Sequence, residues 1–203
     1  MNGLLGIFGG SFNPIHSGHL ILAEFIREEF KLDRIIFIPT GNPPHKKVGD
    51  LERAQYRYDM VKLAIEDNPF FDISDIELKR EGFSYTSDTL KKMKEIYPDE
   101  ELFFICGGDS IIQFPTWHEI GTIFELASII VAERPNVLKE KLENMINEFR
   151  EKYGARILCS SAPHIGISAS EIRKRLKQGL SVRYMVPRAV YEYIEKNNLY
   201  RGV

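Results

Sequence analysis

The alternation of two kinds of apolar pattern along the chain restricts the fold more than any other feature of the sequence. Short runs rich in β-branched and aromatic residues alternate with longer stretches in which apolar residues return every three or four positions. The short runs are typical of buried strands, and the longer stretches are typical of amphipathic helices. We expect strands at Leu4–Phe8, Arg34–Pro39, Phe70–Ile73, Leu102–Cys106, Ser128–Ala132 and Arg156–Cys159. Alternating strands and helices build right-handed βαβ units, so the pattern predicts an α/β fold with a doubly wound, mostly parallel sheet.

Length and charge narrow the class of protein further. The 203 residues, 43% of them hydrophobic, are enough for one substantial core, and no linker-like segment divides the chain, so a single domain over residues 1–203 is expected. The net charge of −2 argues against a nucleic-acid partner. Apolar stretches such as Ala127–Ala132 are far too short to cross a membrane. We therefore expect a soluble, cytoplasmic protein, with Cys106 and Cys159 as buried thiols.

The end of the first expected strand is the strongest candidate for a ligand site. Gly9 and Gly10 precede a helix, so backbone N–H groups can approach an anion there, although a tight turn uses glycine for its geometry alone. His16 and His19 are three residues apart at the start of that helix, and Gly18 between them leaves room for a ligand. Imidazoles in this position can donate hydrogen bonds to phosphate oxygens. Two alternatives are metal chelation, which requires a third ligand, and simple capping of the helix.

Three other segments carry polar groups to the carboxyl edge of the predicted sheet. Ser168 precedes an amphipathic run with Arg173 one turn later, which predicts either a polyphosphate site or an ordinary serine-capped helix. Gly107 ends a strand, and Asp109 either contacts a ribose or a Mg²⁺-bound water or caps the next helix. Lys46 lies in a proline-rich loop, where most lysines are simply solvated.

Residues 6–19, Gly-Ile-Phe-Gly-Gly-Ser-Phe-Asn-Pro-Ile-His-Ser-Gly-His, resemble the signature of the nucleotidyltransferase superfamily of the His-x-Gly-His type. Within it, the chain is most similar to the bacterial nicotinate-nucleotide adenylyltransferases. Four further segments carry this resemblance: Pro43–Lys46, Phe83–Leu90, Gly107–Asp109 followed by Phe114 and Trp117, and Ile167–Arg173. One departure is His118, which stands where relatives often have an aromatic residue such as tyrosine, so the role of its side chain is open.

The resemblance implies a Rossmann-like fold and transfer of AMP from ATP to nicotinate mononucleotide, giving nicotinate adenine dinucleotide and pyrophosphate in NAD biosynthesis. It implies His16, His19, Arg173 and Lys46 as catalytic residues, and Mg²⁺ as a cofactor that arrives with ATP, without a metal site of the protein's own. For ATP it implies Gly9, Gly10, Ser11, Phe12, His16, His19, Gly107, Asp109, Ser168 and Arg173 as binding residues. For nicotinate mononucleotide it implies Lys46, Thr86, Trp117 and His118.

In the mononucleotide site, the resemblance implies that Trp117 stacks on the pyridine ring and that backbone N–H groups at Thr86 and His118 receive its carboxylate. The alternative for Trp117 is a residue that only fills the core. Two rival functions also follow from this sequence, a related transferase for phosphopantetheine or an alcohol phosphate, and a catalytically silent nucleotide-binding protein. The sequence does not predict an oligomeric state.

Overall fold

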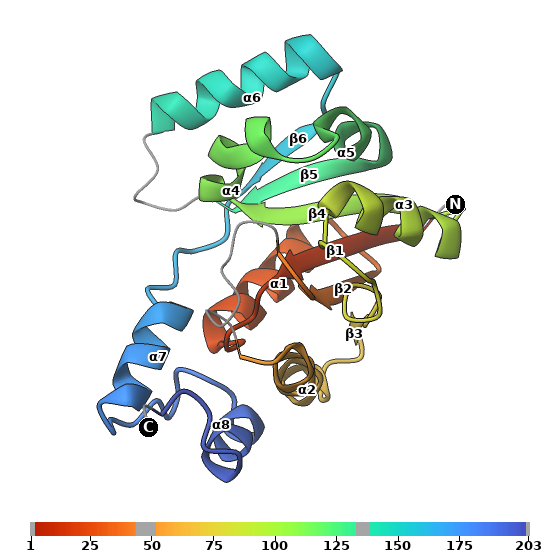
Figure 1. Ribbon diagram of the computed structural model, residues 1–203. Helices are drawn as coiled ribbons and strands as arrows, with labels where there is room; N and C mark the ends of the chain where they lie inside the picture. Colours follow the sequence, from red (N-terminus) through yellow and green to blue (C-terminus); the bar gives the residue numbers. More distant parts are fainter. Residues whose placement is uncertain (1–2, 44–51, 133–138, 202–203) are drawn as a thin grey trace.

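The computed structural model describes residues 3–43, 52–132 and 139–201, and it contains one fully parallel sheet (Figure 1). The six strands lie in the order β3-β2-β1-β4-β5-β6. Their bounds are β1 Leu4–Gly10, β2 Arg34–Pro39, β3 Phe71–Ile73, β4 Glu101–Gly107, β5 Ala127–Ala132 and β6 Ile157–Ser160. The order reverses between β1 and β4, and in sheets of this kind ligands bind at that point, beyond the carboxyl ends of the strands.

Helices connect the strands and cover the sheet. Their bounds are α1 Ser17–Glu29, α2 Ala54–Ile65, α3 Thr86–Ile96, α4 Gly108–Gln113, α5 Ile120–Leu126, α6 Lys139–Tyr153, α7 Ala169–Lys177 and α8 Arg188–Lys196, with a short 3₁₀ turn, η1, at Phe114–Thr116. In Figure 1, α7 and α8 lie together at one end of the molecule, and α6 lies at the opposite end. Within the described residues, no helix has the length and apolar character needed to cross a membrane.

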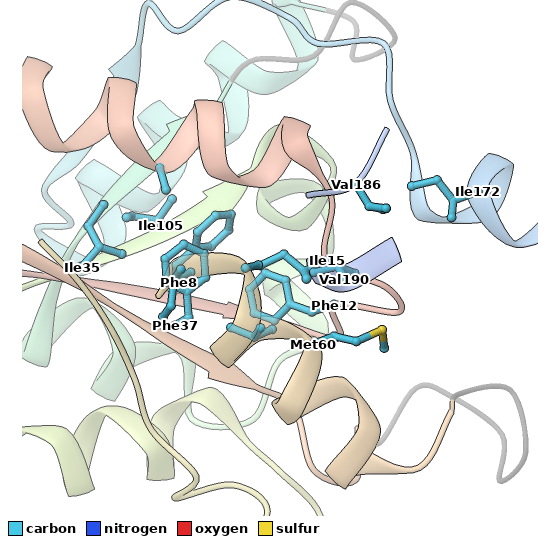
Figure 2. Packing of buried hydrophobic residues seen from close by; sticks show 14 of the residues in the cluster. Phe8, Phe12, Ile15, Ile35, Phe37, Met60, Ile105, Ile172, Val186 and Val190 are labelled. Atoms are coloured by element: carbon cyan, nitrogen blue, oxygen red, sulfur yellow. The ribbon is translucent and has the colours of Figure 1, made fainter. Parts of the chain in front are cut away.

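Two hydrophobic clusters hold the layers together, one on each face of the sheet. Side chains alternate between the faces along each strand, so that Ile7 belongs to one cluster and Phe8 to the other. The first face contributes Phe8, Ile35, Phe37, Ile105 and Ile130, which share a cluster with residues of α1, α2, α7 and α8 (Figure 2). The second face packs against residues of α3, α4, α5 and α6. The loop after β1 and the two C-terminal helices therefore share one core.

The predicted doubly wound, parallel sheet is confirmed, and each expected strand differs from the observed one by at most two residues at either end. Continuous β-branched runs located the strands because both faces of a parallel sheet are buried. The expected burial of both thiols is half wrong. Cys106 is buried, but Cys159 is exposed, because β6 is the edge strand of the sheet and has a neighbour on one side only.

Candidate active site

The loop between β1 and α1 turns inward at the carboxyl edge of the sheet. Phe12 has a φ of 42°, and its ring is almost completely buried in the cluster shared with α7 and α8. Positive φ is uncommon for a bulky residue and costs about 1 kcal/mol or more, so the surrounding core must hold this conformation. The backbone of Gly10 and Ser11 is thereby left to line a cavity at the switch point of the sheet.

Arg57 binds the backbone of this loop through hydrogen bonds, and sequence reasoning missed this residue of the site. The residue is 1% exposed, and its guanidinium nitrogens donate to the carbonyl oxygens of Ser11 at 2.7 Å and of Thr40 at 2.6 Å. It therefore joins the ends of β1 and β2. A signal did exist, because Arg57 lies on the same side of α2 as the buried Met60, Val61 and Ala64. A charge within an apolar helical stripe needs a partner, and here the partners are carbonyl groups.

The two histidines stack at the start of α1. Their ring centroids are 3.7 Å apart with an angle of 25° between the planes, and the His16 N–H donates to Nδ1 of His19 at 3.2 Å. Neutral His19 must then carry its proton on Nε2, which makes that nitrogen a donor. His16 is the N-cap residue of α1, so the capping alternative describes part of what these residues do.

Gly18 has a packing role next to His16. A Cβ atom at this position would lie 3.1 Å from Nδ1 and 3.2 Å from Cε1 of His16. Both distances are tighter than ordinary van der Waals contact, so the missing side chain makes room for the His16 ring. The absence of a side chain at position 18 therefore serves the packing of His16, and the expectation that it leaves room for a ligand stays a prediction.

The start of α7 is joined to the same loop. Ser168 is the N-cap of α7, and its Oγ accepts from the N–H of Glu171 at 3.2 Å. One turn later, Nη1 of Arg173 donates to the carbonyl oxygen of Asn13 at 2.8 Å. Arg173 is therefore not the solvated side chain of an ordinary capped helix, because it links α7 to the segment that carries His16.

A cavity of about 290 Å³ is lined by predicted site residues from three separate parts of the chain. Gly9, Gly10 and Ser11 line it from the end of β1, Thr86 lines it from the start of α3, and Trp117 and His118 line it from the segment after η1. Thr86 is the first residue of α3, where backbone N–H groups have no partner within the helix. The cavity thus has a donor end at α3 and an aromatic wall.

Trp117 is a wall residue and a core residue at once. Its ring packs on Phe114 with 4.4 Å between centroids, while the side chain also lines the cavity. Next to it, the His118 ring lies 4.5 Å from the ring of Tyr85, which gives that side chain a packing role against the start of α3. The salt bridge between Lys91 of α3 and Glu119 also joins α3 to the segment that contains His118.

The remaining predicted residues that the structure describes are not part of the lining of this cavity. Gly107 is the N-cap of α4, so capping by Asp109 is wrong; Asp109 is an exposed residue in the first turn of that helix. His16, His19, Ser168 and Arg173 form the neighbouring region at the starts of α1 and α7. Lys46 lies outside the described residues. Within residues 3–43, 52–132 and 139–201, no group of three or more His, Cys, Asp or Glu side chains comes together as a metal site.

Glu77 is a second residue of the cavity that sequence reasoning missed. It is 7% exposed, and Oγ1 of Thr89 donates to its Oε1 at 2.7 Å. The chain after β2 passes so close that a Cβ atom at Gly41 would lie 2.2 Å from the Glu77 carbonyl oxygen. Glu77 falls in an irregular segment between β3 and α3, where no periodicity marks a buried position.

Comparison with known proteins identifies the family. A model of the cytidylyltransferase-like family matches residues 7–175. The chain is 45% identical over 198 residues to a Desulfitobacterium hafniense protein named "probable nicotinate-nucleotide adenylyltransferase", with 97% of this chain and 95% of that protein covered. A Thermoanaerobacter protein of the same name is 42% identical, with 97% and 94% covered. The chain belongs to the nicotinate-nucleotide adenylyltransferase family. The family inferred from the His-x-Gly-His block and its companion segments is thereby confirmed.

Solved structures show that the fold is also that of this family. The Plasmodium falciparum nicotinic acid mononucleotide adenylyltransferase complexed with NaAD superposes with a TM-score of 0.80 at 23% identity, covering 98% of both chains. The same parasite protein complexed with APC gives a TM-score of 0.77 at 22% identity, again covering 98% of both chains. At this identity the likeness concerns the fold, and it confirms the Rossmann-like nucleotidyltransferase architecture.

Proposed function

We propose that this member of the nicotinate-nucleotide adenylyltransferase family transfers AMP from ATP to nicotinate mononucleotide. The observation that carries the proposal is the cavity at the β1–β4 switch point, which combines an aromatic wall, a helix start and the glycine turn of β1. The names of the close relatives support the same reaction. The cavity would take the acceptor, and the starts of α1 and α7 would take the triphosphate.

Chemistry at these helix starts is in-line displacement. An oxygen of the mononucleotide phosphate attacks the α-phosphorus of ATP, the bond from that phosphorus to the bridging oxygen breaks, and the electron pair leaves with pyrophosphate. We assign no protein nucleophile, so catalysis consists of positioning and charge stabilisation. Neutral His19 carries its proton on Nε2, which would donate to a phosphate oxygen. Arg173, Ser168 and Lys46 would stabilise the charge that develops on pyrophosphate.

The acceptor would bind with its pyridine ring against Trp117. Stacking of an electron-poor ring on an indole contributes about 1–2 kcal/mol. The N–H groups at the start of α3 and at His118 would receive the carboxylate, which selects the acid over the amide because a carboxamide NH₂ cannot accept their hydrogen bonds.

Mg²⁺ would enter as part of the substrate. It binds phosphate oxygens and keeps several waters, so it needs few protein ligands. When bound, the ion would neutralise charge on the phosphates, and Gly107 and Asp109 at the start of α4 would lie on the nucleotide side.

A pyrophosphate-release assay with ATP and a panel of acceptors tests the proposal. We expect nicotinate mononucleotide to be the best acceptor. Its kcat/KM should be at least about tenfold above that of the amide mononucleotide, because the amide leaves N–H donors of the site without an acceptor. Turnover with phosphopantetheine or an alcohol phosphate instead would identify the rival transferase. Binding of ATP without turnover of any acceptor would identify a silent nucleotide-binding protein.

A further inference from the structure

Glu77 is a buried acid in the wall of the cavity, and the proposed reaction gives it no task. Its Oε1 accepts the hydrogen bond from Thr89, but the described residues give its Oε2 no partner at hydrogen-bonding geometry. A buried polar atom without a partner costs about 1–3 kcal/mol, which a bound ligand can recover. The cavity that Glu77 lines is the one that also contains Thr86 and Trp117.

The surroundings of Glu77 favour a proton on the carboxyl group. Burial raises the pKa of Glu77, and this effect exceeds the opposing effects of the Thr89 hydrogen bond, the Arg80 charge, and the nearby Ser84 hydroxyl and Gly41 N–H. Arg57 is a more distant positive charge on the side of α2. Arg80 is itself engaged, since its Nη1 donates to Oγ1 of Thr89 at 3.1 Å. Glu77 therefore lacks a direct ion pair of its own among the described residues.

Geometry places this acid near the donor end of the cavity. Thr86 and Thr89 are three residues apart in α3, hence on one side of the helix, and both line the cavity. The hydrogen bond to Thr89 holds the Glu77 carboxyl one turn from the first N–H groups of α3. Under the proposed function, on which this step rests, those N–H groups receive the substituent of the pyridine ring.

We propose that Glu77 is a specificity-determining residue whose protonated Oε2 donates a hydrogen bond to the ring carboxylate of the acceptor. A carboxylic acid can donate to a carboxylate, whereas the ionised form can only accept and would repel it. The ionised form could instead accept from the NH₂ group of a carboxamide. Binding of the acid would thus be linked to the proton on Glu77, and the preference for the acid over the amide would depend on pH.

The direction follows from the raised pKa. Below it Glu77 is neutral and favours the acid; as the pH rises through it, the proton is lost and the acid loses its donor. The ratio of kcat/KM for the acid to that for the amide should therefore fall with rising pH. Taking this ratio cancels groups that affect both acceptors alike.

The test measures this ratio upward in pH from the ordinary glutamate pKa through the range in which the enzyme stays folded. We expect a fall of at least about tenfold in the unsubstituted enzyme and a flat ratio in Glu77→Gln, whose NH₂ donates at every pH. Glu81→Gln, at an exposed glutamate nearby, is the matched control and should keep the fall. Among the described residues, His118 and Tyr85 are the other titratable side chains that line the cavity, so the fall must also persist in His118→Phe and in Tyr85→Phe.

Calorimetry of the unsubstituted enzyme gives a second reading that does not depend on folding of a variant. Above the Glu77 pKa, titration of nicotinate mononucleotide in two buffers of different ionisation enthalpy should show uptake of about one proton. Saturable binding without proton uptake, or a ratio that does not change with pH, would overturn the role of Glu77 alone. Absence of acid binding and turnover would overturn the proposed function itself.

Discussion

At the scale of single residues, His19 serves the protein and the proposed chemistry with different atoms. Its Nδ1 accepts the hydrogen bond from His16 N–H, which helps to close the start of α1. Its Nε2 carries the proton that would be donated to a phosphate oxygen. Substitution therefore removes a capping contact, worth about 1 kcal/mol, and a transition-state donor, worth about a hundredfold in rate.

We expect His19→Ala to lower kcat about a hundredfold or more while shifting the melting temperature by only a few degrees. His164→Ala, at an exposed histidine, is the matched control and should change neither quantity. Steady-state pyrophosphate release and thermal unfolding measure the two effects. A variant that melts normally and retains activity within a few-fold would remove His19 from the mechanism.

How far the sequence predicts a residue depends on whether its neighbours in the chain explain it. Gly9, Gly10 and His16 follow a strand and open a helix, so their position at the sheet edge could be predicted from local pattern. Trp117 and Thr86 required the family resemblance, because nothing local places them in one cavity. Arg57 and Glu77 could not be assigned to the site, since their partners are carbonyl and hydroxyl groups that only the tertiary fold brings near.

At the scale of elements, α7 connects the hydrophobic core to the loop that precedes His16. Its inner face buries Ile172 and Leu176, and Arg173 on the next position reaches the Asn13 carbonyl. The Tyr200 hydroxyl, beyond α8, donates to Oδ1 of the same asparagine at 2.8 Å. Two C-terminal segments therefore fix the turn that precedes His16.

We expect Arg173→Ala to raise KM for ATP and lower kcat while leaving calorimetric binding of nicotinate mononucleotide almost unchanged. Arg175→Ala is the matched control on the same helix, because Nε of Arg175 donates to the Ser181 carbonyl, away from the β1–α1 loop. It should leave KM for ATP unchanged. If Arg173→Ala weakened both ligands equally, its contact with Asn13 would be structural only.

At the scale of the whole molecule, the two faces of the sheet support different parts of the site: the loop before His16 packs on one face, and Trp117 of the cavity packs on the other. The face shared by α1, α2, α7 and α8 contains the buried loop residues Phe12 and Ile15, whereas the face covered by α6 does not. Figure 2 shows Phe12 and Ile15 beside Val190 of α8. The assignment of residues 1–203 to a single domain remains a prediction, as does the role of Lys46.

Two matched core substitutions separate these effects. Ile194→Ala in α8 and Ile146→Ala in α6 remove the same atoms from buried positions, and each should lower the free energy of unfolding by about 2–4 kcal/mol. Only Ile194→Ala should also raise KM for ATP, since its cluster includes the loop that precedes His16. Denaturant unfolding and initial-rate kinetics at a temperature where both variants are folded measure this. Equal kinetic effects would show that the two faces are coupled.

The unequal surroundings of the two cysteines have a practical consequence for solution work. Cys106 is buried, and burial raises its pKa far above the usual range, so its thiolate is scarce; Cys159 is exposed on the edge strand. A maleimide dye should therefore attach at one position without any change to the sequence. The chain also contains a single tryptophan, Trp117, in the wall of the cavity. The dye on Cys159 and the indole of Trp117 then form a donor–acceptor pair for energy transfer that needs no engineered residue. One chromophore lies at the cavity and the other on the edge strand β6.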